Sequence, residues 1–201
     1  MSGSPLLQTK KALRERVRLL VAAMPPAERL VRSARAQARL IETPEFQRAR
    51  TLMIYHSDSS EVDTHDIVLE CLAGKKRVSL PRTQRGTRTL QVREILDVAR
   101  DLEHSALGKF KEPLGILPAI ALEHIDLVIV PGRAFDAQGN RLGRGAGYYD
   151  RFFGKQEVRA VAAALAFDCQ VLEEVPCAAH DHPMDLIVTE TRVIRPVERG
   201  E

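Results

Sequence analysis

The chain has 201 residues, 44% of them apolar and 28% charged, which is ordinary for one globular domain with a substantial core and excludes wholesale disorder. A formal net charge of +3 is too small to argue for nucleic-acid binding. Cys71, Cys169 and Cys177 show no metal-binding spacing and no apolar run is long enough for a membrane span, so we expect a cytoplasmic protein without a disulfide framework, zinc ribbon or membrane contact.

The predicted elements alternate between helices and strands along the chain. Apolar residues recur at helical spacing after Lys10, and the Pro25-Pro26 pair separates the first helix from the second. We expect helices over residues 10–24, 27–41, 45–49, from 63 or 64 to about 72, and from about 148. We expect strands over residues 51–55, 77–80, 89–92, 125–130, 160–167 and 186–189, with 193–194 as an extension. The prolines between residues 113 and 118 predict a linker.

This order of elements predicts an α/β sandwich with a mostly parallel central sheet. No repeat, low-complexity segment or clear boundary divides the chain, so we expect a single domain over residues 1–201. The strand over residues 125–130 is apolar throughout its IDLVIV sequence, as expected of a strand that is buried on both faces. Ligands of open α/β sheets bind beyond the carboxyl ends of such strands, and a glycine-rich loop follows shortly after this one.

The glycine-rich loop is the most informative segment, with the sequence NRLGRGAGYYDRF over residues 140–152. Glycine permits positive φ and lacks the Cβ that keeps a bulky anion away, so the N–H groups of such a loop can bind phosphate. Arg141 and Arg144 add positive charge, and Asp150 offers an oxygen that could share Mg²⁺ with a phosphate. A flexible surface turn is the alternative, but the flanking charges favour a nucleotide-phosphate loop. The spacing matches neither a Walker loop nor a dinucleotide fingerprint.

Several charged residues elsewhere allow either a structural or a functional interpretation. Lys10 and Arg14 lie on one helix face and are either a solvated pair or phosphate ligands. Asp185 precedes a strand and either caps a turn or provides a second carboxylate for Mg²⁺. Glu61 follows the first strand, where a carboxylate can accept hydrogen bonds from the N–H groups of a heterocycle.

Aromatic and histidine side chains near the loop also have two interpretations. We expect one of Tyr148 and Tyr149 to pack inward and the other to contact a ligand. His180 and His182 form an H-x-H pair, but no further ligands follow at a recognisable spacing, which favours a pair of loop histidines over a transition-metal site.

Taken together and in order, these residues resemble the 5-formyltetrahydrofolate cyclo-ligase family, also called 5,10-methenyltetrahydrofolate synthetase, over nearly the whole chain. The most specific block is the glycine loop with Gly139 before it and Tyr148-Tyr149-Asp150 after it. The other blocks are individually weak: residues 10–14, 61–64, 74–75, 80–82, 112–113, 131–136, 185 and 189–190.

The resemblance implies a three-layer α/β/α sandwich of the sugar-phosphate isomerase and CoA-transferase type. It implies a ligase that uses ATP and Mg²⁺ to convert 5-formyltetrahydrofolate to 5,10-methenyltetrahydrofolate, with release of ADP and phosphate and no obligate protein partner. It assigns ATP binding to Lys10, Arg14, Arg141, Leu142, Gly143, Arg144, Gly145, Ala146, Gly147, Tyr148 and Tyr149. It assigns Mg²⁺ to Asp150 and Asp185, the folate to His56, Glu61 and Tyr148, and catalysis to Arg144 and Tyr148.

The sequence departs from the family pattern at three places. Ala146 stands where glycine or lysine is common, and alanine is tolerated there unless φ must be positive. His56 stands at a usually apolar position, and Phe110 is a candidate for the aromatic that stacks on the folate. The candidate lysines for the terminal phosphate are Lys10, Lys11, Lys109 and Lys111.

Three rival functions remain open on the sequence alone. The first is a family paralogue that binds ATP but acts on another substrate or on none. The second is a non-catalytic nucleotide sensor on the same sandwich. The third, nucleic-acid binding by the arginine-rich helices, lacks an aromatic-interleaved surface or a known module.

Overall fold

The computed structural model describes residues 5–84, 86–106, 110–178 and 180–197, and its centre is a seven-stranded sheet. The strand order is β12-β11-β9-β6-β1-β2-β3, in which the five inner strands are parallel to one another and the edge strands β12 and β3 are antiparallel to their neighbours. These strands span β1 Thr51–Ile54, β2 Arg77–Gln84, β3 Thr89–Ile95, β6 Leu127–Val130, β9 Val161–Leu165, β11 Leu186–Val188 and β12 Val193–Ile194. The expected mostly parallel sheet is confirmed.

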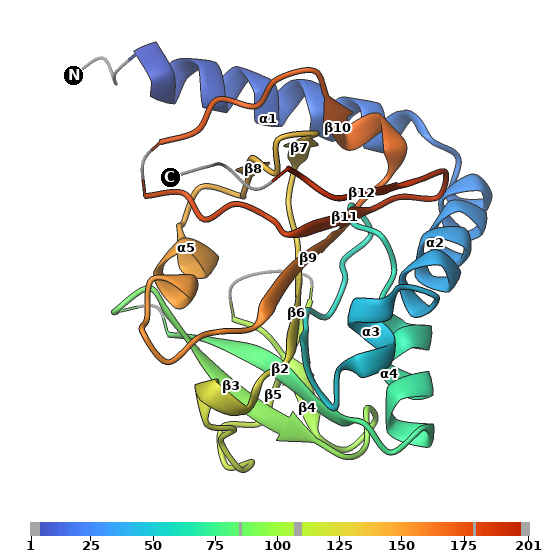
Figure 1. Ribbon diagram of the computed structural model, residues 1–201, viewed down its shortest axis with the longest axis vertical. Coiled ribbons are helices and arrows are strands. Elements are labelled where there is room, and N and C mark those ends of the chain that lie inside the picture. Colours follow the sequence, from blue (N-terminus) through green and yellow to red (C-terminus); the bar gives the residue numbers. More distant parts are fainter. Residues whose placement is uncertain (1–4, 85, 107–109, 179, 198–201) are drawn as a thin grey trace.

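Helices cover the two faces of this sheet unequally (Figure 1). On one face lie α2 Pro26–Ile41, α3 Pro44–Arg48 and α4 His65–Ala73. On the other face lies the short helix α5 Tyr148–Phe153, with irregular segments beside it. The second helical layer of the expected three-layer sandwich is therefore much reduced. The long helix α1 Pro5–Ala23 crosses one end of the sheet.

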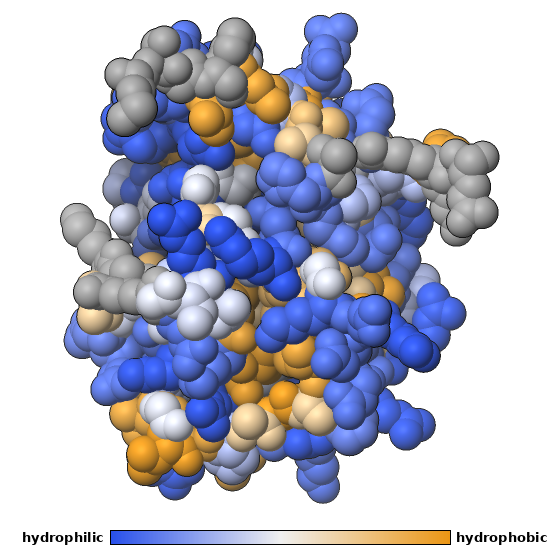
Figure 2. All heavy atoms as spheres, turned by 90° about the vertical axis from the view of Figure 1, so that its left-hand side faces the viewer, coloured by the Kyte–Doolittle hydropathy of each residue, from blue (hydrophilic) through white to orange (hydrophobic). Residues whose placement is uncertain are grey.

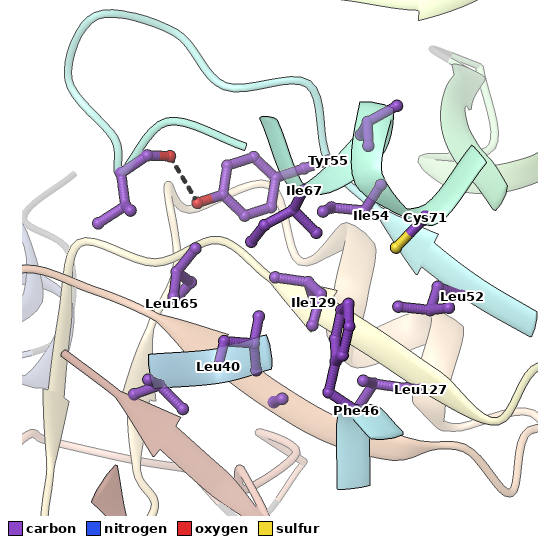
Figure 3. Close-up of a cluster of buried hydrophobic side chains, with 14 of the residues drawn as sticks. Leu40, Phe46, Leu52, Ile54, Tyr55, Ile67, Cys71, Leu127, Ile129 and Leu165 are labelled. Carbon is purple, nitrogen blue, oxygen red and sulfur yellow. Dashed lines mark hydrogen bonds between the residues drawn. The ribbon is translucent and has the colours of Figure 1, made fainter. Parts of the chain in front are cut away.

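Side chains of the inner strands alternate between two apolar clusters, because successive strand residues point to opposite faces. Leu52, Ile54, Leu127 and Ile129 join the cluster beneath α2, α3 and α4, whereas Met53 joins the cluster beneath α5. Figure 3 shows the first cluster, in which Leu40 and Phe46 of the helices meet the strand residues. Burial on both faces explains why these strands are apolar throughout.

Two smaller sheets that the sequence did not predict flank the central one. Strands β7 Ala134–Asp136, β8 Arg141–Leu142 and β10 Val171–Leu172 form one of them, in which Ala134 and Leu142 share a buried cluster with Val17 of α1. Strands β4 Leu102–His104 and β5 Lys111–Pro113 form the other sheet, so the expected linker begins with a strand. Single-turn helices η1 Leu122–His124 and η2 Asp168–Gln170 complete the described elements.

Most other helices and strands follow the expected positions, although α1 begins at Pro5 rather than at residue 10 and β6 begins at Leu127 rather than at residue 125. Strand β2 runs on through Pro81, because beyond Ser79 it pairs only with β3 and proline is tolerated at such an edge. Helix α5 is short, at six residues, before the chain turns towards β9. Among the described residues, no helix is both long enough and apolar enough to cross a membrane.

The loop after β1 is fixed at both of its ends by buried hydrogen bonds. The Tyr55 hydroxyl donates to the Val62 carbonyl oxygen over 3.0 Å, and Figure 3 shows this bond beside the core. The Thr64 hydroxyl donates to the Tyr55 carbonyl oxygen over 2.8 Å. The polar residues between these anchors are therefore held in place at the carboxyl end of β1.

Candidate functional site

A cavity of about 600 Å³ lies beyond the carboxyl ends of β1 and β6, where the open α/β sheet predicts a ligand site. Tyr55 and His56 follow β1, and Pro131 follows β6. Helix α1, the glycine loop, α5 and the side of the β2–β3 hairpin that carries Pro81, Thr83 and Leu90 also line it. The face seen in Figure 2, the left-hand side of Figure 1, carries apolar surface in a hollow that hydrophilic side chains border. The predicted site residues that line the cavity are Lys10, Arg14, His56, Glu61, all of residues 141–149, and Asp150.

The glycine loop has the backbone that the sequence predicts. Gly145 and Gly147 have φ values of +104° and +69°, and the only described non-glycine residues with positive φ are Lys75 and Arg88. Ala146 therefore does not need positive φ, and the alanine fits. Gly143 has no positive φ, but a Cβ there would approach the Arg141 guanidinium to 2.8 Å, so that side chain would have to shift.

Two arginine side chains donate hydrogen bonds to the carbonyl groups of this loop. The Arg14 Nε donates to the Gly143 carbonyl oxygen over 2.8 Å, and the Arg151 Nη1 donates to the carbonyl oxygens of Ala146 and Gly147 over 2.8 and 2.7 Å. Within the described part of the chain, no hydrogen bond uses the N–H groups of residues 143–147 as donors. The loop thus presents free donors to the cavity, which is the chemistry of an anion site.

Arg141 is almost fully buried at the base of the loop, in β8. One of its nitrogens donates to the Asp150 Oδ1 over 2.6 Å, and its guanidinium lies 5.7 Å from the centre of the Tyr149 ring. The Arg141 Nε is buried and has no hydrogen-bond partner among the described residues. Arg39 and Arg93 each have a buried Nε of the same kind, so this nitrogen by itself does not identify a ligand site.

Lys10 lies on α1 and faces the cavity beside Arg14. Its side chain is buried, and its Nζ is 2.6 Å from the Asp181 Oδ2. Burial raises the pKa of Asp181, but the hydrogen bonds from Lys10 and the Ala178 N–H and the positive charge of Lys10 together outweigh it, so the pKa lies below its usual range. Of the other candidate lysines, Lys111 lines the cavity, Lys11 is exposed outside its lining, and Lys109 lies outside the described residues. Phe110 lines the cavity.

Arg144 connects the glycine loop to the loop after β1. Its Nη2 lies 2.6 Å from both the Asp58 Oδ2 and the Glu61 Oε1. Glu61 is almost fully enclosed, with 8% of its side chain exposed. Burial raises the pKa of Glu61, the negative charge of Asp58 raises it further, and Arg144 opposes the shift only in part. Arg144, which we predict to bind phosphate, and Glu61, which we predict to bind the folate, therefore contact each other directly.

Tyr148 and Tyr149, of which we expect one to pack inward and the other to contact a ligand, are both half-buried. Burial, followed by the charge of Glu61, raises the pKa of Tyr149 well above its usual range. Both pack against the cluster beneath α5, and both line the cavity. His56 is half-buried, its Nδ1 is 3.2 Å from the Ser57 carbonyl oxygen, and burial lowers its pKa.

Asp185 is not among the residues that line the cavity. Its Oδ2 accepts a hydrogen bond from the Ala162 N–H over 2.8 Å, at the start of β9 and β11. His182 stacks on Phe153 with 4.2 Å between the ring centres, which fits the loop interpretation of the H-x-H pair. Among the described residues, no three acidic, histidine or cysteine side chains form a metal site. Asp150 is thus the predicted metal ligand that the fold brings to the glycine loop.

Sequence reasoning missed the carboxylates that hold the cavity cations and one further arginine. Asp58 and Asp181 pair with Arg144 and Lys10, and Arg133 donates from its Nη1 to the Ser60 Oγ over 3.0 Å. None of these residues stands at a spacing that would identify it. They gain a role only because the fold brings together segments that are distant in the sequence.

Comparison with known proteins adds an independent observation. Residues 7–190 match the 5-formyltetrahydrofolate cyclo-ligase family. The chain is 28% identical to the mouse 5-formyltetrahydrofolate cyclo-ligase over 94% of this chain and 98% of the mouse protein. It is 30% identical to the mitochondrial 5-formyltetrahydrofolate cyclo-ligase of Arabidopsis thaliana over 94% of this chain and 76% of that protein. The NMR structure of Aquifex aeolicus 5,10-methenyltetrahydrofolate synthetase superposes with a TM-score of 0.82 at 31% identity, covering 96% of this chain and 94% of that one.

Proposed function

The chain belongs to the 5-formyltetrahydrofolate cyclo-ligase family, and we propose that it converts 5-formyltetrahydrofolate and ATP into 5,10-methenyltetrahydrofolate, ADP and phosphate. The observation that carries this proposal is the glycine loop, whose N–H groups form no hydrogen bond within the described part of the chain, beside the cavity side chains of Lys10, Arg14 and Arg144. Both features call for a multiply charged anion, and a nucleotide triphosphate is the anion that a ligase of this family requires. The expected cytoplasmic location stays a prediction.

The nucleotide phosphates would lie against the glycine loop. The N–H groups of residues 143–147 supply donors that need no rearrangement, and Lys10, Arg14 and Arg144 supply positive charge around them. Phosphoryl transfer requires mainly positioning and charge stabilisation, which this arrangement provides. We assign no covalent nucleophile to the protein.

Mg²⁺ fits the donor set at one end of the loop. Magnesium in nucleotide sites is commonly held by one or two carboxylates together with substrate phosphates, so a three-carboxylate cluster is not needed. Asp150 lines the cavity and would hold the ion with the phosphate oxygens. The ion would neutralise charge on the phosphates. We leave Asp185 out of the proposed ligand set, because its carboxylate accepts a hydrogen bond from the Ala162 N–H of β9 instead.

The folate would occupy the part of the cavity near β1. Its volume of about 600 Å³ lies within the usual range for small-molecule sites. Glu61 offers a carboxylate to the N–H groups of the pterin, and Tyr148 offers an aromatic face and a hydroxyl. Pro81, Leu90 and Phe110 add apolar wall. His56 lies at the border of this region.

The chemistry follows from the weakness of a formamide as an electrophile. Transfer of the γ-phosphoryl group to the formyl oxygen releases ADP and makes that oxygen part of a leaving group. N10 then forms a bond to the formyl carbon and loses its proton, and the C–O bond breaks with release of phosphate. Arg144 and Tyr148 are the side chains that we propose to stabilise and orient the reacting groups, because both line the cavity at the loop.

A direct assay tests this proposal. The absorbance of the methenyl product should grow only when ATP, Mg²⁺ and 5-formyltetrahydrofolate are all present. Arg144→Ala should lower the rate by at least about 100-fold, as expected for loss of one preorganised charge. Arg77→Ala, which removes an exposed pair with Glu94 outside the cavity, should retain the rate.

The outcome separates the rival functions. ATP binding without any methenyl product would refute the cyclo-ligase proposal and favour a sensor. ATP cleavage with a different acceptor only would favour a paralogue with another substrate.

A further inference from the structure

The carboxylate pair beside Arg144 lies on a rigid segment. Asp58 and Glu61 belong to the loop that the Tyr55 and Thr64 hydroxyl groups anchor at its two ends. Within the loop, the Asp58 N–H donates to the Glu61 Oε2 over 3.1 Å, and the Ser60 N–H donates to the Asp58 Oδ1 over 2.8 Å. The two carboxylates are therefore held close together even though they repel each other.

A second arginine shares the charge of this pair. Arg133 is half-buried, donates to the Ser60 hydroxyl, and interacts electrostatically with both Asp58 and Glu61. Its burial and the charge of Arg144 lower its pKa. Two guanidinium groups thus balance two carboxylates, but only Arg144 also lines the cavity.

The pairing of Arg144 with Glu61 conflicts with the roles proposed above. In the proposed reaction Arg144 binds a nucleotide phosphate and Glu61 binds the pterin, yet without ligand the two side chains are joined over 2.6 Å. A phosphate that takes the Arg144 guanidinium must compete with Asp58 and Glu61. Once it does so, the Glu61 Oε1 is free to accept a hydrogen bond from the folate, and Arg133 remains as its counter-ion.

We propose that Asp58 and Arg133 are positioning residues that couple the two substrates through Arg144, an inference that rests on the proposed function. Asp58 holds Arg144 away from the phosphate position when no nucleotide is bound. Arg133 keeps the charge of Glu61 balanced after Arg144 has moved. Nucleotide binding then strengthens folate binding, and by thermodynamic reciprocity folate strengthens nucleotide binding by the same factor.

The experiment measures equilibrium binding of AMP-PNP with Mg²⁺, and of 5-formyltetrahydrofolate, each with and without the other, by calorimetry. In the unsubstituted protein each ligand should tighten the other about fivefold, at the lower end of usual coupling. Asp58→Asn should tighten AMP-PNP alone about threefold, the size expected for a partly exposed ion pair. Arg133→Gln should reduce the coupling factor towards one.

Asp63→Asn is the matched control, because it removes the same charge from the same loop. Asp63 contacts the Ser57 hydroxyl and the His65 N–H rather than Arg144, and asparagine can still accept both bonds. It should leave AMP-PNP affinity unchanged. Equal tightening by both substitutions would indicate a general field effect and overturn the role of Asp58.

The positioning roles of Asp58 and Arg133 can be wrong even if the proposed reaction is right. If the unsubstituted protein forms the methenyl product but shows no coupling between AMP-PNP and folate, the positioning role is wrong and the cyclo-ligase activity stands. If coupling persists undiminished in Arg133→Gln, Arg133 is not the counter-ion that we infer. If the unsubstituted protein forms no product, the proposed function itself is wrong.

Discussion

At the scale of single residues, each main cation of the cavity is already held by an oxygen atom of the protein. Lys10 contacts Asp181, Arg14 contacts the Gly143 carbonyl, and Arg141 contacts Asp150. These contacts fix long side chains that would otherwise lose conformational freedom on binding a ligand. A phosphate must, however, exchange with carboxylates, so the site is suited to a ligand with several negative charges.

Asp150 and Asp185 can be distinguished by their metal dependence. Asp150→Asn should raise the Mg²⁺ concentration for half-maximal rate by about tenfold, because a phosphate-bound ion loses its protein oxygen. Asp185→Asn is the control and should leave the Mg²⁺ titration unchanged, since Asp185 binds the Ala162 N–H. A shift caused by Asp185→Asn alone would reverse the assignment.

Glu61 should give the folate interaction a pH dependence. Its pKa is raised by burial and by Asp58, so it becomes protonated at a higher pH than an ordinary glutamate. Protonation removes a carboxylate acceptor, and the KM for 5-formyltetrahydrofolate at saturating ATP should therefore rise as the pH falls from about 8 to about 5. Glu61→Gln should weaken folate more than ATP and flatten this rise. An identical pH profile in both proteins would contradict the role of Glu61.

The sequence identified many of these residues by type but not their partners. Lys10 and Arg14 could be placed on one helix face from their spacing, and the structure puts both at the cavity. Nothing in the spacing connects Lys10 with Asp181, which lies 171 positions away. Pairings of this kind depend on how α1 crosses the sheet, which local patterns do not specify.

At the scale of elements, the glycine loop combines positions that have positive φ with positions that do not. Gly145 has a φ of +104° although a Cβ there would meet nothing closer than 3.5 Å, so its requirement is conformational rather than steric. Ala146 beside it has no such requirement. The two positions therefore offer a test of whether loop conformation matters for the nucleotide.

Gly145→Ala should raise the KM for ATP by about fivefold or more, since forcing alanine into positive φ costs about 1 kcal/mol and moves the N–H groups. Ala146→Gly should change the KM for ATP by less than about twofold, because that backbone is already accessible to alanine. Steady-state kinetics with varied ATP measures both. If the two variants behave alike, the conformation of the loop is not what binds the phosphates.

The elements themselves were largely predictable because their signals are local. Pro26 starts α2, Gly74 follows α4, and the apolar run over residues 125–130 contains β6. The small sheet of β7, β8 and β10 was not predictable, because its strands have only two or three residues each. Strands so short carry no periodicity in the sequence, and their contact with α1 joins segments that are distant along the chain.

At the scale of the whole molecule, two apolar clusters on opposite faces of one sheet support the site. Ile129 is fully buried in the cluster beneath α2, α3 and α4, and the chain continues from its strand to Pro131 at the cavity. Ile129→Ala should lower the free energy of unfolding by about 2–5 kcal/mol. Leu96→Ala, at a residue 73% exposed, should change it by less than about 0.5 kcal/mol. Denaturant unfolding measures both, and equal losses would contradict the assigned core.

The central sheet was more predictable than the size of the two helical layers that cover it. Alternating helices and apolar strands predict the parallel sheet, and the comparison with the Aquifex structure agrees. A helix that begins near residue 148 was predicted, but its end after six residues was not, so the reduced second layer was not predicted. The expectation of a single domain over residues 1–201 stays a prediction.

The most direct test of phosphate binding by the loop is a titration of the glycine-¹⁵N-labelled protein with AMP-PNP and Mg²⁺, followed by NMR. The chain has 12 glycines, few enough for each amide signal to be assigned by substitution. The signals of Gly143, Gly145 and Gly147 should shift saturably, while that of Gly74, which closes α4 far from the cavity, should not. Unmoved loop signals at a nucleotide concentration that supports product formation would contradict the account.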